Sequence, residues 1–355
     1  MAAVKGAEEP GTAGALAIPS DVWASVEGHE ERLRRLTQLL AENRLPHALL
    51  FYGPEGVGKK RAAMATAATL LCASPAEGRP CGVCESCRAL AAGAHPDFIL
   101  AVPEKTGKAT RSIKIEAVRA LRAETARRPK LASRLVAVID DAETMNTAAA
   151  NALLKTLEEP AGDAVFILVT GAKQALLPTI VSRCMTMAFG TLPDEALSRV
   201  LERNGVPGRE AAALLPIADG SAGRALRLYA EDALALREDA MAVMESLSRL
   251  TPEEIFAHGK RLGALERERL SEWLRHFRLL LRDLMALFGG SPALLNIDLA
   301  ERLSTLARSF PAEAATLAER EAAETVRRLS GSNVTPRLLV EAFLFRVARG
   351  EYDRK

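Results

Sequence analysis

Long apolar runs, aromatic residues and an excess of charge of either sign are all scarce in this sequence of 355 residues. No apolar run approaches the ~18 residues that a membrane-spanning helix requires, so we predict no membrane span and no membrane partner. Lysine plus arginine number 47 against 45 aspartate plus glutamate, a net charge of +2. A free-standing nucleic-acid binder usually carries a basic surface, so we expect any contact with DNA to be shared with other chains.

A secretory signal pattern is also absent from the first twenty residues. Glu8 and Glu9 lie in a stretch rich in alanine and glycine that has no basic start and no apolar block. We therefore expect a flexible tail at 1–20 and a cytoplasmic protein, whose thiols stay reduced. Because single cores stop growing at ~250–300 residues, the length predicts more than one domain.

Short apolar runs alternate with helical patterns over the first half of the chain. Runs typical of buried strands lie at 47–52, 98–102, 135–139 and 165–169. Helical patterns lie at 30–40, 59–71, 115–128, 147–158 and 176–181. Because strands that alternate with helices form parallel sheets covered on both faces, we predict an α/β core at 21–190.

Strand patterns end near residue 190, and only helical patterns follow. Residues 191–245 are expected to form a small helical domain whose helices are broken by glycine-containing segments at 205–208 and 220–223. From 246 to 355 we predict an all-helical domain. Its apolar residues recur at steps of three and four, as in Leu270, Trp273, Leu274 and Phe277.

A phosphate-loop pattern, Gly53-Pro54-Glu55-Gly56-Val57-Gly58-Lys59, follows the first predicted strand and opens a predicted helix. In such a loop successive backbone N–H groups, with a helix N-terminus behind them, bind phosphate oxygens, and the lysine reaches the outer phosphates. The alternative is a glycine-rich turn without a ligand. The strand before the loop and the helix after it favour the phosphate loop, with Gly53, Gly56, Gly58 and Lys59 as candidate binding residues.

Two residues depart from the requirements of an ATPase. The template has serine or threonine after the lysine, because that hydroxyl binds Mg²⁺, but Lys60 stands there. The third strand ends in Asp140-Asp141, where an ATPase of this kind usually has aspartate and glutamate, so Asp141 is one methylene short. We predict a degenerate nucleotide site and no productive use of ATP and Mg²⁺ by this chain.

Four cysteines, Cys72, Cys81, Cys84 and Cys87, form a C-x8-C-x2-C-x2-C pattern. Four thiolates this close can complete a tetrahedral Zn²⁺ site with no open position, which is structural rather than catalytic. Two disulfides, an iron–sulfur cluster and free thiols are the alternatives. A reducing compartment argues against disulfides, and the Cys-Pro expected of the iron–sulfur signature is absent. The fifth cysteine, Cys184, is expected to be a buried apolar residue.

Arg183 lies after the fourth predicted strand, within Ser182-Arg183-Cys184. An arginine at the end of an α/β core is usually a surface charge. In oligomeric ATPases, however, such an arginine can reach the γ-phosphate bound to a neighbouring subunit. Spacing alone leaves both interpretations open.

These motifs occur together with two others, His95-Pro96-Asp97 and the segment 153–160, Leu-Leu-Lys-Thr-Leu-Glu-Glu-Pro. The combination resembles the bacterial DNA polymerase III clamp loaders, AAA+ proteins whose gamma/tau and delta-prime subunits share a four-cysteine zinc insert. The resemblance spans about residues 25–230. It implies an AAA+ phosphate-loop core, a helical lid and an all-helical collar domain that joins the subunits.

Within that family, Lys60 and Asp141 favour the delta-prime type over the ATP-hydrolysing gamma type, which is the alternative. The resemblance implies a subunit that helps load the sliding clamp onto primed DNA, together with gamma/tau and delta subunits, as part of the polymerase holoenzyme rather than as an autonomous enzyme. It makes Arg183 an arginine finger acting in trans and Thr170 a polar residue at a sensor position. It also aligns Arg224 with the lid sensor.

Two further interpretations remain from the sequence. His47 and His95 match motifs of the family, and we expect a structural hydrogen bond for each. A zinc-dependent nucleic-acid binder unrelated to clamp loaders is the second rival. It is disfavoured by the low net charge and by the position of the four cysteines inside an α/β core.

Overall fold

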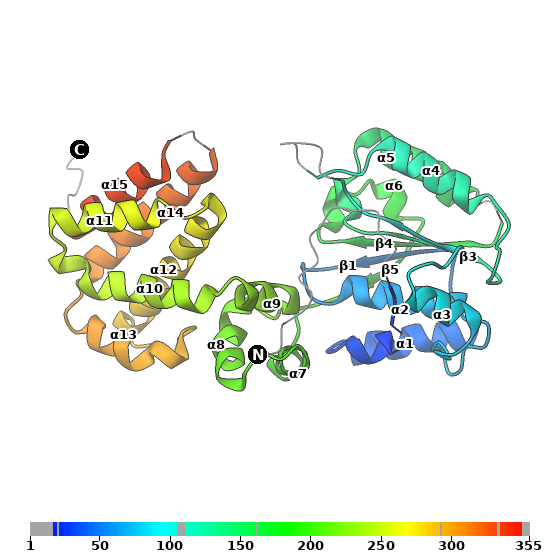
Figure 1. The fold of residues 1–355 in the computed structure, drawn as a ribbon, viewed down its shortest axis with the longest axis horizontal. Helices are drawn as coiled ribbons and strands as arrows, with labels where there is room; N and C mark the ends of the chain where they lie inside the picture. The colour runs from blue at the N-terminus through cyan, green and yellow to red at the C-terminus, as the bar shows by residue number, and fades with distance from the viewer. Residues whose placement is uncertain are drawn as a thin grey trace. The chain divides into compact units, whose positions relative to one another are not determined.

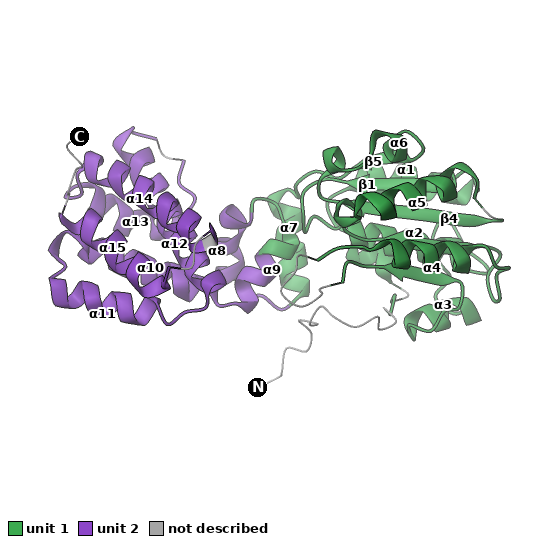
Figure 2. Cartoon of the chain, turned by 90° about the horizontal axis from the view of Figure 1, so that it is seen from above, with its two compact units in different colours: residues 1–204, 219–224 green, residues 205–218, 225–355 purple. Residues whose placement is uncertain are grey.

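The computed structural model describes residues 17–19, 21–104, 111–160, 162–291, 293–331 and 334–349. The chain divides into two compact units (Figure 2). The first unit contains residues 1–204 and 219–224, and the second contains 205–218 and 225–355. Among the described residues, no helix is both long enough and apolar enough to span a bilayer.

The first unit is built on a five-stranded parallel sheet (Figure 1). Its strands are β1 (Ala48–Tyr52), β2 (Phe98–Ala101), β3 (Leu135–Ile139), β4 (Ala164–Thr170) and β5 (Met185–Ala188). Their order in the sheet is β2-β3-β4-β1-β5. The four predicted strands are confirmed within a residue at each end, and the prediction missed β5, a four-residue strand at the sheet edge.

Helices cover both faces of the sheet, as predicted (Figure 1). One face carries α1 (Glu30–Ala41), α2 (Lys59–Leu71) and α3 (Glu85–Ala91). The other carries α4 (Ile115–Thr125), α5 (Thr147–Glu158) and α6 (Pro178–Val181). Successive residues of β3 alternate between the two cores: Val136 and Val138 contact the first, and Leu135, Ala137 and Ile139 the second. The alternation follows from the two-residue period of a strand.

Three short 3-10 helices and one further α-helix belong to this unit: η1 (Val22–Ser25), η2 (Ala142–Thr144), η3 (Lys173–Ala175) and α7 (Asp194–Arg203). Two predicted helix ends were wrong. We expected α4 to continue to residue 128, but it ends at Thr125, because Arg127 leaves the helix to bond the Pro96 carbonyl and the Asp97 carboxylate. The helix expected from 176 begins at Pro178, whose fixed φ suits the first helical position.

The described residues of the second unit form helices and the turns that connect them, with no strand. Its helices are α8 (Gly208–Ala218), α9 (Ala222–Ala230, which begins in the first unit), α10 (Ala233–Ser246), η4 (Leu247–Arg249), α11 (Pro252–Leu262), α12 (Arg267–Phe288), η5 (Ile297–Leu299), α13 (Ala300–Ala307), α14 (Ala312–Gly331) and α15 (Pro336–Arg349). The predicted stripe on α12 is buried: Trp273 stacks on Phe277 at 5.4 Å, and Phe277 meets Phe343 edge-on. The apolar side chains of α12 therefore pack into a core inside this unit.

Candidate functional site

The candidate nucleotide residues meet at the carboxyl edge of the sheet. Parallel strands end on the same edge, and Tyr52 of β1 lies beside Thr170 of β4 in the sheet register. The phosphate loop leaves this edge, and Gly53 N–H donates to the Thr170 carbonyl at 3.3 Å. Asp140 follows β3 at the same edge. The fold thus gathers the residues that the sequence motifs single out.

Glycine is required at two loop positions by close contacts within the first unit. A Cβ on Gly53 would lie 1.9 Å from the Phe189 carbonyl oxygen, and one on Gly56 would lie 2.3 Å from Ser221 Oγ. Both residues also have positive φ. The Ser221 hydroxyl donates to the Glu55 carbonyl at 2.8 Å, and Gly223 N–H donates to the Gly56 carbonyl at 2.9 Å. Ser221 and the first turn of α9 are therefore docked directly on the phosphate loop.

The side chain of Lys59 turns back into its own loop. Its ammonium donates to the Gly53 carbonyl at 2.8 Å and to the Pro54 carbonyl at 2.5 Å, and the residue is buried. Burial lowers the pKa of Lys59, although nearby carboxylates, with Glu143 foremost, act in the opposite direction. The ammonium that would bind the outer phosphates is thus held by two carbonyls of the chain.

Lys60 makes an ion pair that the sequence did not predict. Its Nζ lies 2.9 Å from Asp140 Oδ2. In an ATPase the carboxylate at the end of this strand would assist Mg²⁺ binding. Here the charge of Asp140 is instead balanced by a lysine of the same chain.

Asp141 and Glu143 lie at the turn that follows β3. Asp141 adopts a left-handed conformation with φ 47°, and burial raises its pKa, with Asp140 and Glu143 adding to the effect. Glu143 was not predicted: its Oε1 accepts from Gly171 N–H at 2.8 Å, which ties the β3 turn to the end of β4. The only sign of Glu143 in the sequence was that it is a third acidic residue close to Asp140 and Asp141. The turn therefore carries more negative charge than the motif alone suggested.

Thr170, the expected sensor residue, is fully buried at the end of β4. Its hydroxyl oxygen accepts from Ala172 N–H at 3.1 Å, within its own turn. The hydroxyl therefore stabilises the strand end in this structure.

The four predicted cysteines converge. Their sulfur atoms all lie within 4.8 Å of one another, and Cys72 Sγ is 3.9 Å from Cys84 Sγ. Backbone N–H groups point at the sulfurs, including Cys81 N–H to Cys72 at 3.2 Å and Cys84 N–H to Cys81 at 3.4 Å. N–H bonds from Val83 and Cys84 lower the pKa of Cys81 to about 6, which favours the thiolate. Four thiols at this separation fit a tetrahedral metal ion such as Zn²⁺.

The fifth cysteine lies apart from the cluster. Cys184 is buried in the core beneath α5 and α6, and burial raises its pKa to about 11. It is therefore a neutral, apolar thiol, as predicted.

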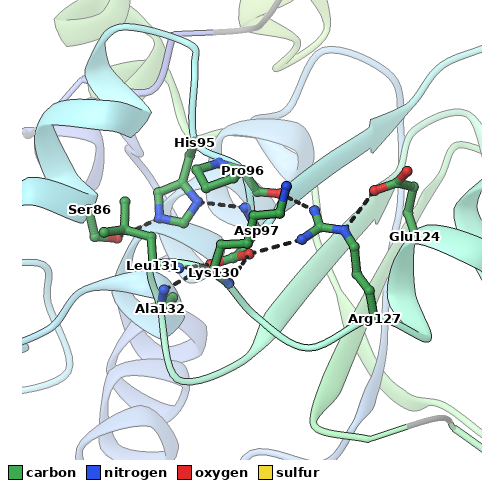
Figure 3. A network of polar contacts seen from close by, with 9 residues as sticks. All are labelled: Ser86, His95, Pro96, Asp97, Glu124, Arg127, Lys130, Leu131 and Ala132. Atoms are coloured by element: carbon green, nitrogen blue, oxygen red, sulfur yellow. Dashed lines mark hydrogen bonds and ion pairs between the residues drawn. The ribbon is translucent and has the colours of Figure 1, made fainter.

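A buried polar network ties the cysteine module to the sheet (Figure 3). Ser86, between two of the cysteines, lies with its Oγ 2.7 Å from His95 Nε2, and His95 Nδ1 accepts from Asp97 N–H at 3.0 Å. Nδ1 is therefore unprotonated and Nε2 is the donor to Ser86, whose own hydroxyl donates to the Leu71 carbonyl. This bonding fixes His95 as a structural residue.

Asp97 is fully buried and organises the segment after α4 (Figure 3). Its carboxylate accepts N–H bonds from Lys130, Leu131 and Ala132 at 2.7–2.8 Å and pairs with Arg127 at 3.3 Å. Burial alone would raise the pKa of Asp97, but these backbone bonds outweigh it and the pKa is lowered. The His-Pro-Asp motif is thus a structural clamp between the cysteine module and the 127–132 segment.

Two further motif residues lie near the end of α5. His47 Nε2 bonds the Leu157 carbonyl at 3.1 Å, the structural bond we expected. Arg183, just after α6, is partly exposed and pairs with Glu158, the last residue of α5, at 2.5 Å. None of these contacts links Arg183 to the phosphate-loop residues of its own chain.

Comparison with known proteins shows the family of this chain. Residues 28–193 match the family described as DNA polymerase III, delta subunit. A DNA polymerase III subunit delta' of Pseudomonas aeruginosa is 41% identical over 59% of this chain and 63% of its own length. The Escherichia coli subunit delta' is 32% identical over 74% of this chain and 76% of its own length. The chain belongs to the delta' family of DNA polymerase III subunits.

The chain is also similar to a tau subunit and to two solved structures. The Escherichia coli subunit tau is 32% identical over 81% of this chain but only 48% of its own length. A gamma-subunit-related protein of Thermotoga maritima covers 90% of this chain and 99% of its own, at 18% identity and a TM-score of 0.39. A Thermotoga maritima RuvB mutant covers 81% and 85%, at 16% identity and a TM-score of 0.41.

Proposed function

We propose that this chain is the delta' subunit of a clamp loader, which acts with gamma/tau and delta subunits to place a sliding clamp on primed DNA. In this proposal it hydrolyses no ATP. It completes the ATP site of a neighbouring motor subunit with Arg183. The helical residues 191–245 act as the lid of the α/β core, and 246–355 join the collar of the assembly.

The observation that carries the absence of hydrolysis is the Lys60–Asp140 ion pair. A P-loop ATPase holds Mg²⁺ with a hydroxyl after the loop lysine and a strand-end aspartate. Here Lys60, a cation, stands in place of the hydroxyl, and Asp140 is already paired with Lys60. A Mg²⁺ ion entering this place would meet a positive charge and would have to displace Lys60 from Asp140.

Zinc has a structural role in this proposal. Cys72, Cys81, Cys84 and Cys87 would hold one Zn²⁺ ion with no open coordination position, so the ion contributes folding energy and no catalysis. Ser86, beside Cys87, then links the metal module to His95 and through it to the sheet.

Arg183 suits the role of an arginine finger for a physical reason. A guanidinium presents donors in a fixed planar fork, which matches the oxygens of a phosphoryl group better than an ammonium does. In other nucleotide hydrolases such a finger contributes roughly 10³–10⁵ in rate. Arg183 is partly exposed beyond α6, so a neighbouring chain can approach it.

The test is the DNA- and clamp-stimulated ATPase of a reconstituted loader that contains Arg183→Ala. We expect lower turnover, by less than the full effect of a finger, because only one of several ATP sites loses it. Arg183→Lys keeps the charge but loses the fork, so it should resemble Arg183→Ala. Wild-type turnover and wild-type clamp loading with Arg183→Ala would mean that Arg183 is a surface charge.

The degenerate loop is tested with Lys59→Ala. The isolated wild-type chain should give no ATP turnover above background, and a loader carrying Lys59→Ala should load clamps nearly as well as the wild type. A steady ATPase of the isolated chain that disappears in Lys59→Ala would favour the gamma-type motor instead.

A further inference from the structure

Both terminal nitrogens of Arg183 are bonded inside its own chain. Nη2 lies 2.5 Å from Glu158 Oε1, and Nη1 donates to the Thr179 carbonyl at 3.0 Å. The two charged side chains are 36% and 46% exposed, so the pair lies at the surface and can be opened from outside. The nitrogens that a finger would turn toward a phosphate are therefore already occupied.

The position of Glu158 is unfavourable for the helix that carries it. Glu158 is the last residue of α5, and Glu159 follows as its C-cap. The C-terminus of a helix carries partial negative charge, so a carboxylate there is repelled by the helix dipole. Arg183 offsets that repulsion. The stability of α5 by itself does not favour a glutamate at position 158.

Packing keeps the two partners within reach of each other. Leu157, the residue before Glu158, is buried in the same core as Ile180 of α6. The Leu157 carbonyl is fixed by His47, and Arg183 N–H donates to the Ile180 carbonyl at 3.1 Å. The end of α5 and the turn after α6 are thus held by buried residues, and the ion pair follows from this arrangement.

We propose that Glu158 is a positioning residue that latches Arg183 until the γ-phosphate of a neighbouring subunit displaces it. This inference rests on the role of Arg183 proposed above. In the free subunit the guanidinium is held against Glu158 and Thr179. In the assembly a triphosphate, with more negative charge than one carboxylate, takes over the terminal nitrogens.

The strength of the latch is bounded by its exposure. Surface ion pairs are weak because water and salt screen them and because two long side chains must be ordered. Removing such a pair shifts the balance between latched and free Arg183 by about two- to fivefold. The latch therefore delays the finger without blocking it.

The first experiment needs no partner subunit. The full chain is treated with phenylglyoxal, which modifies free guanidinium groups, and labelling of Arg183 is followed by mass spectrometry. Glu158→Gln should label Arg183 about two- to fivefold faster than the wild type. Glu159→Gln is the matched control, since it removes the adjacent acidic side chain at the helix end but leaves the pair intact.

The second experiment uses the reconstituted loader. Glu158→Gln should raise ATPase in the absence of DNA and clamp, by less than the roughly two- to fivefold expected at the one site that Arg183 serves, because the other ATP sites are unchanged. The rise should vanish in the double variant with Arg183→Ala. Glu158→Asp, one methylene shorter, should fall between Glu158→Gln and the wild type. Added salt should reduce the difference between Glu158→Gln and the wild type, because it screens the pair.

The outcomes separate the two proposals. Unchanged Arg183 labelling in Glu158→Gln, or unchanged or lower ATPase while Arg183→Ala is impaired, overturns the latch and leaves the finger. An Arg183→Ala loader with wild-type activity overturns the finger itself, whatever the labelling. Faster labelling together with an Arg183-dependent rise in ATPase supports both. A thermal melt of Glu158→Gln near that of the wild type excludes misfolding as the cause.

Discussion

The phosphate-loop edge and the cysteine cluster are both built from groups that usually bind ions, but they differ in how those groups are satisfied. At the loop edge the chain supplies its own partners: the Lys59 ammonium bonds two loop carbonyls, and Lys60 pairs with Asp140. At the cluster four thiols face one another within 4.8 Å and accept only weak bonds from backbone N–H groups.

This difference indicates which region depends on a ligand. A lysine–aspartate pair is complete without metal, so the loop edge can keep its structure in the absence of nucleotide. Four adjacent thiols gain little from one another, and their deprotonated forms repel. A divalent cation removes that repulsion and adds four bonds. Metal should therefore stabilise the cluster strongly, and nucleotide should stabilise the loop edge little.

The largest expected loss of stability follows from a substitution in the cysteine cluster. Cys84→Ser should reduce bound zinc from one ion per chain to well below one. It should also lower the free energy of unfolding by several kcal/mol, since structural zinc contributes about 10–16 kcal/mol in small peptides. Elemental analysis and urea denaturation measure the two changes. Cys184→Ser is the control for zinc content, and less than one zinc per chain in freshly prepared, reduced wild-type protein would refute the site.

The clamp beside the cluster gives the next largest effect. Asp97→Asn removes a buried charge that accepts several N–H bonds, which should cost about 2–4 kcal/mol at pH 7. Because the pKa of Asp97 is lowered in the folded protein, its contribution is present above the unfolded value of 3.8 and is lost as the pH falls through the folded value. The difference between wild type and variant should therefore shrink below about pH 4.

Urea denaturation at pH 7 and pH 3 measures this change. Asp163→Asn, at an exposed aspartate, is the matched control and should have little effect at either pH. An Asp97→Asn variant as stable as wild type at pH 7 would mean that the carboxylate is not what holds the 127–132 segment.

The smallest change in stability is expected at the loop edge. Lys60→Thr loses an ion pair between a lysine side chain that is 43% exposed and the largely buried Asp140, which should cost about 1 kcal/mol. It also restores the Mg²⁺-binding hydroxyl and frees Asp140, so Mg²⁺-dependent binding of a fluorescent ATP analogue should appear. Lys60→Met frees Asp140 without adding a hydroxyl and should show no such gain. Equal binding by the two variants would mean that the hydroxyl is not the missing group.

Features set by local sequence were predictable, because spacing along one segment determines them. Strands β1 to β4, the loop and the converging cysteines follow from apolar runs and short motif spacings. β5 was missed because Met185–Ala188 contains a polar threonine and lacks the continuous apolar run that marked the equally short β2. The early end of α4 depends on Arg127 reaching Asp97, a contact between segments some thirty residues apart that helical periodicity cannot indicate.

The same limit applies to the charged pairs of the candidate site. Lys60 could be identified as a departure from the motif, but its pairing with Asp140 requires the ends of β1 and β3 to lie on one edge. The Arg183–Glu158 pair requires the packing of α6 against α5. Sequence motifs therefore identified the charged residues of the candidate site. Only the tertiary structure shows which of them already pair with a residue of the same chain.

The docking of Gly223 on the phosphate loop has a consequence for how such sequences evolve. Any side chain at Gly56 would collide with Ser221, and a Cβ on Gly223 would come within 2.9 Å of the Gly56 Cα. Selection for folding alone is therefore enough to keep these glycines, even in a lineage that no longer handles nucleotide. A glycine-rich signature of this kind can outlast the activity for which it is usually named, and it then records ancestry.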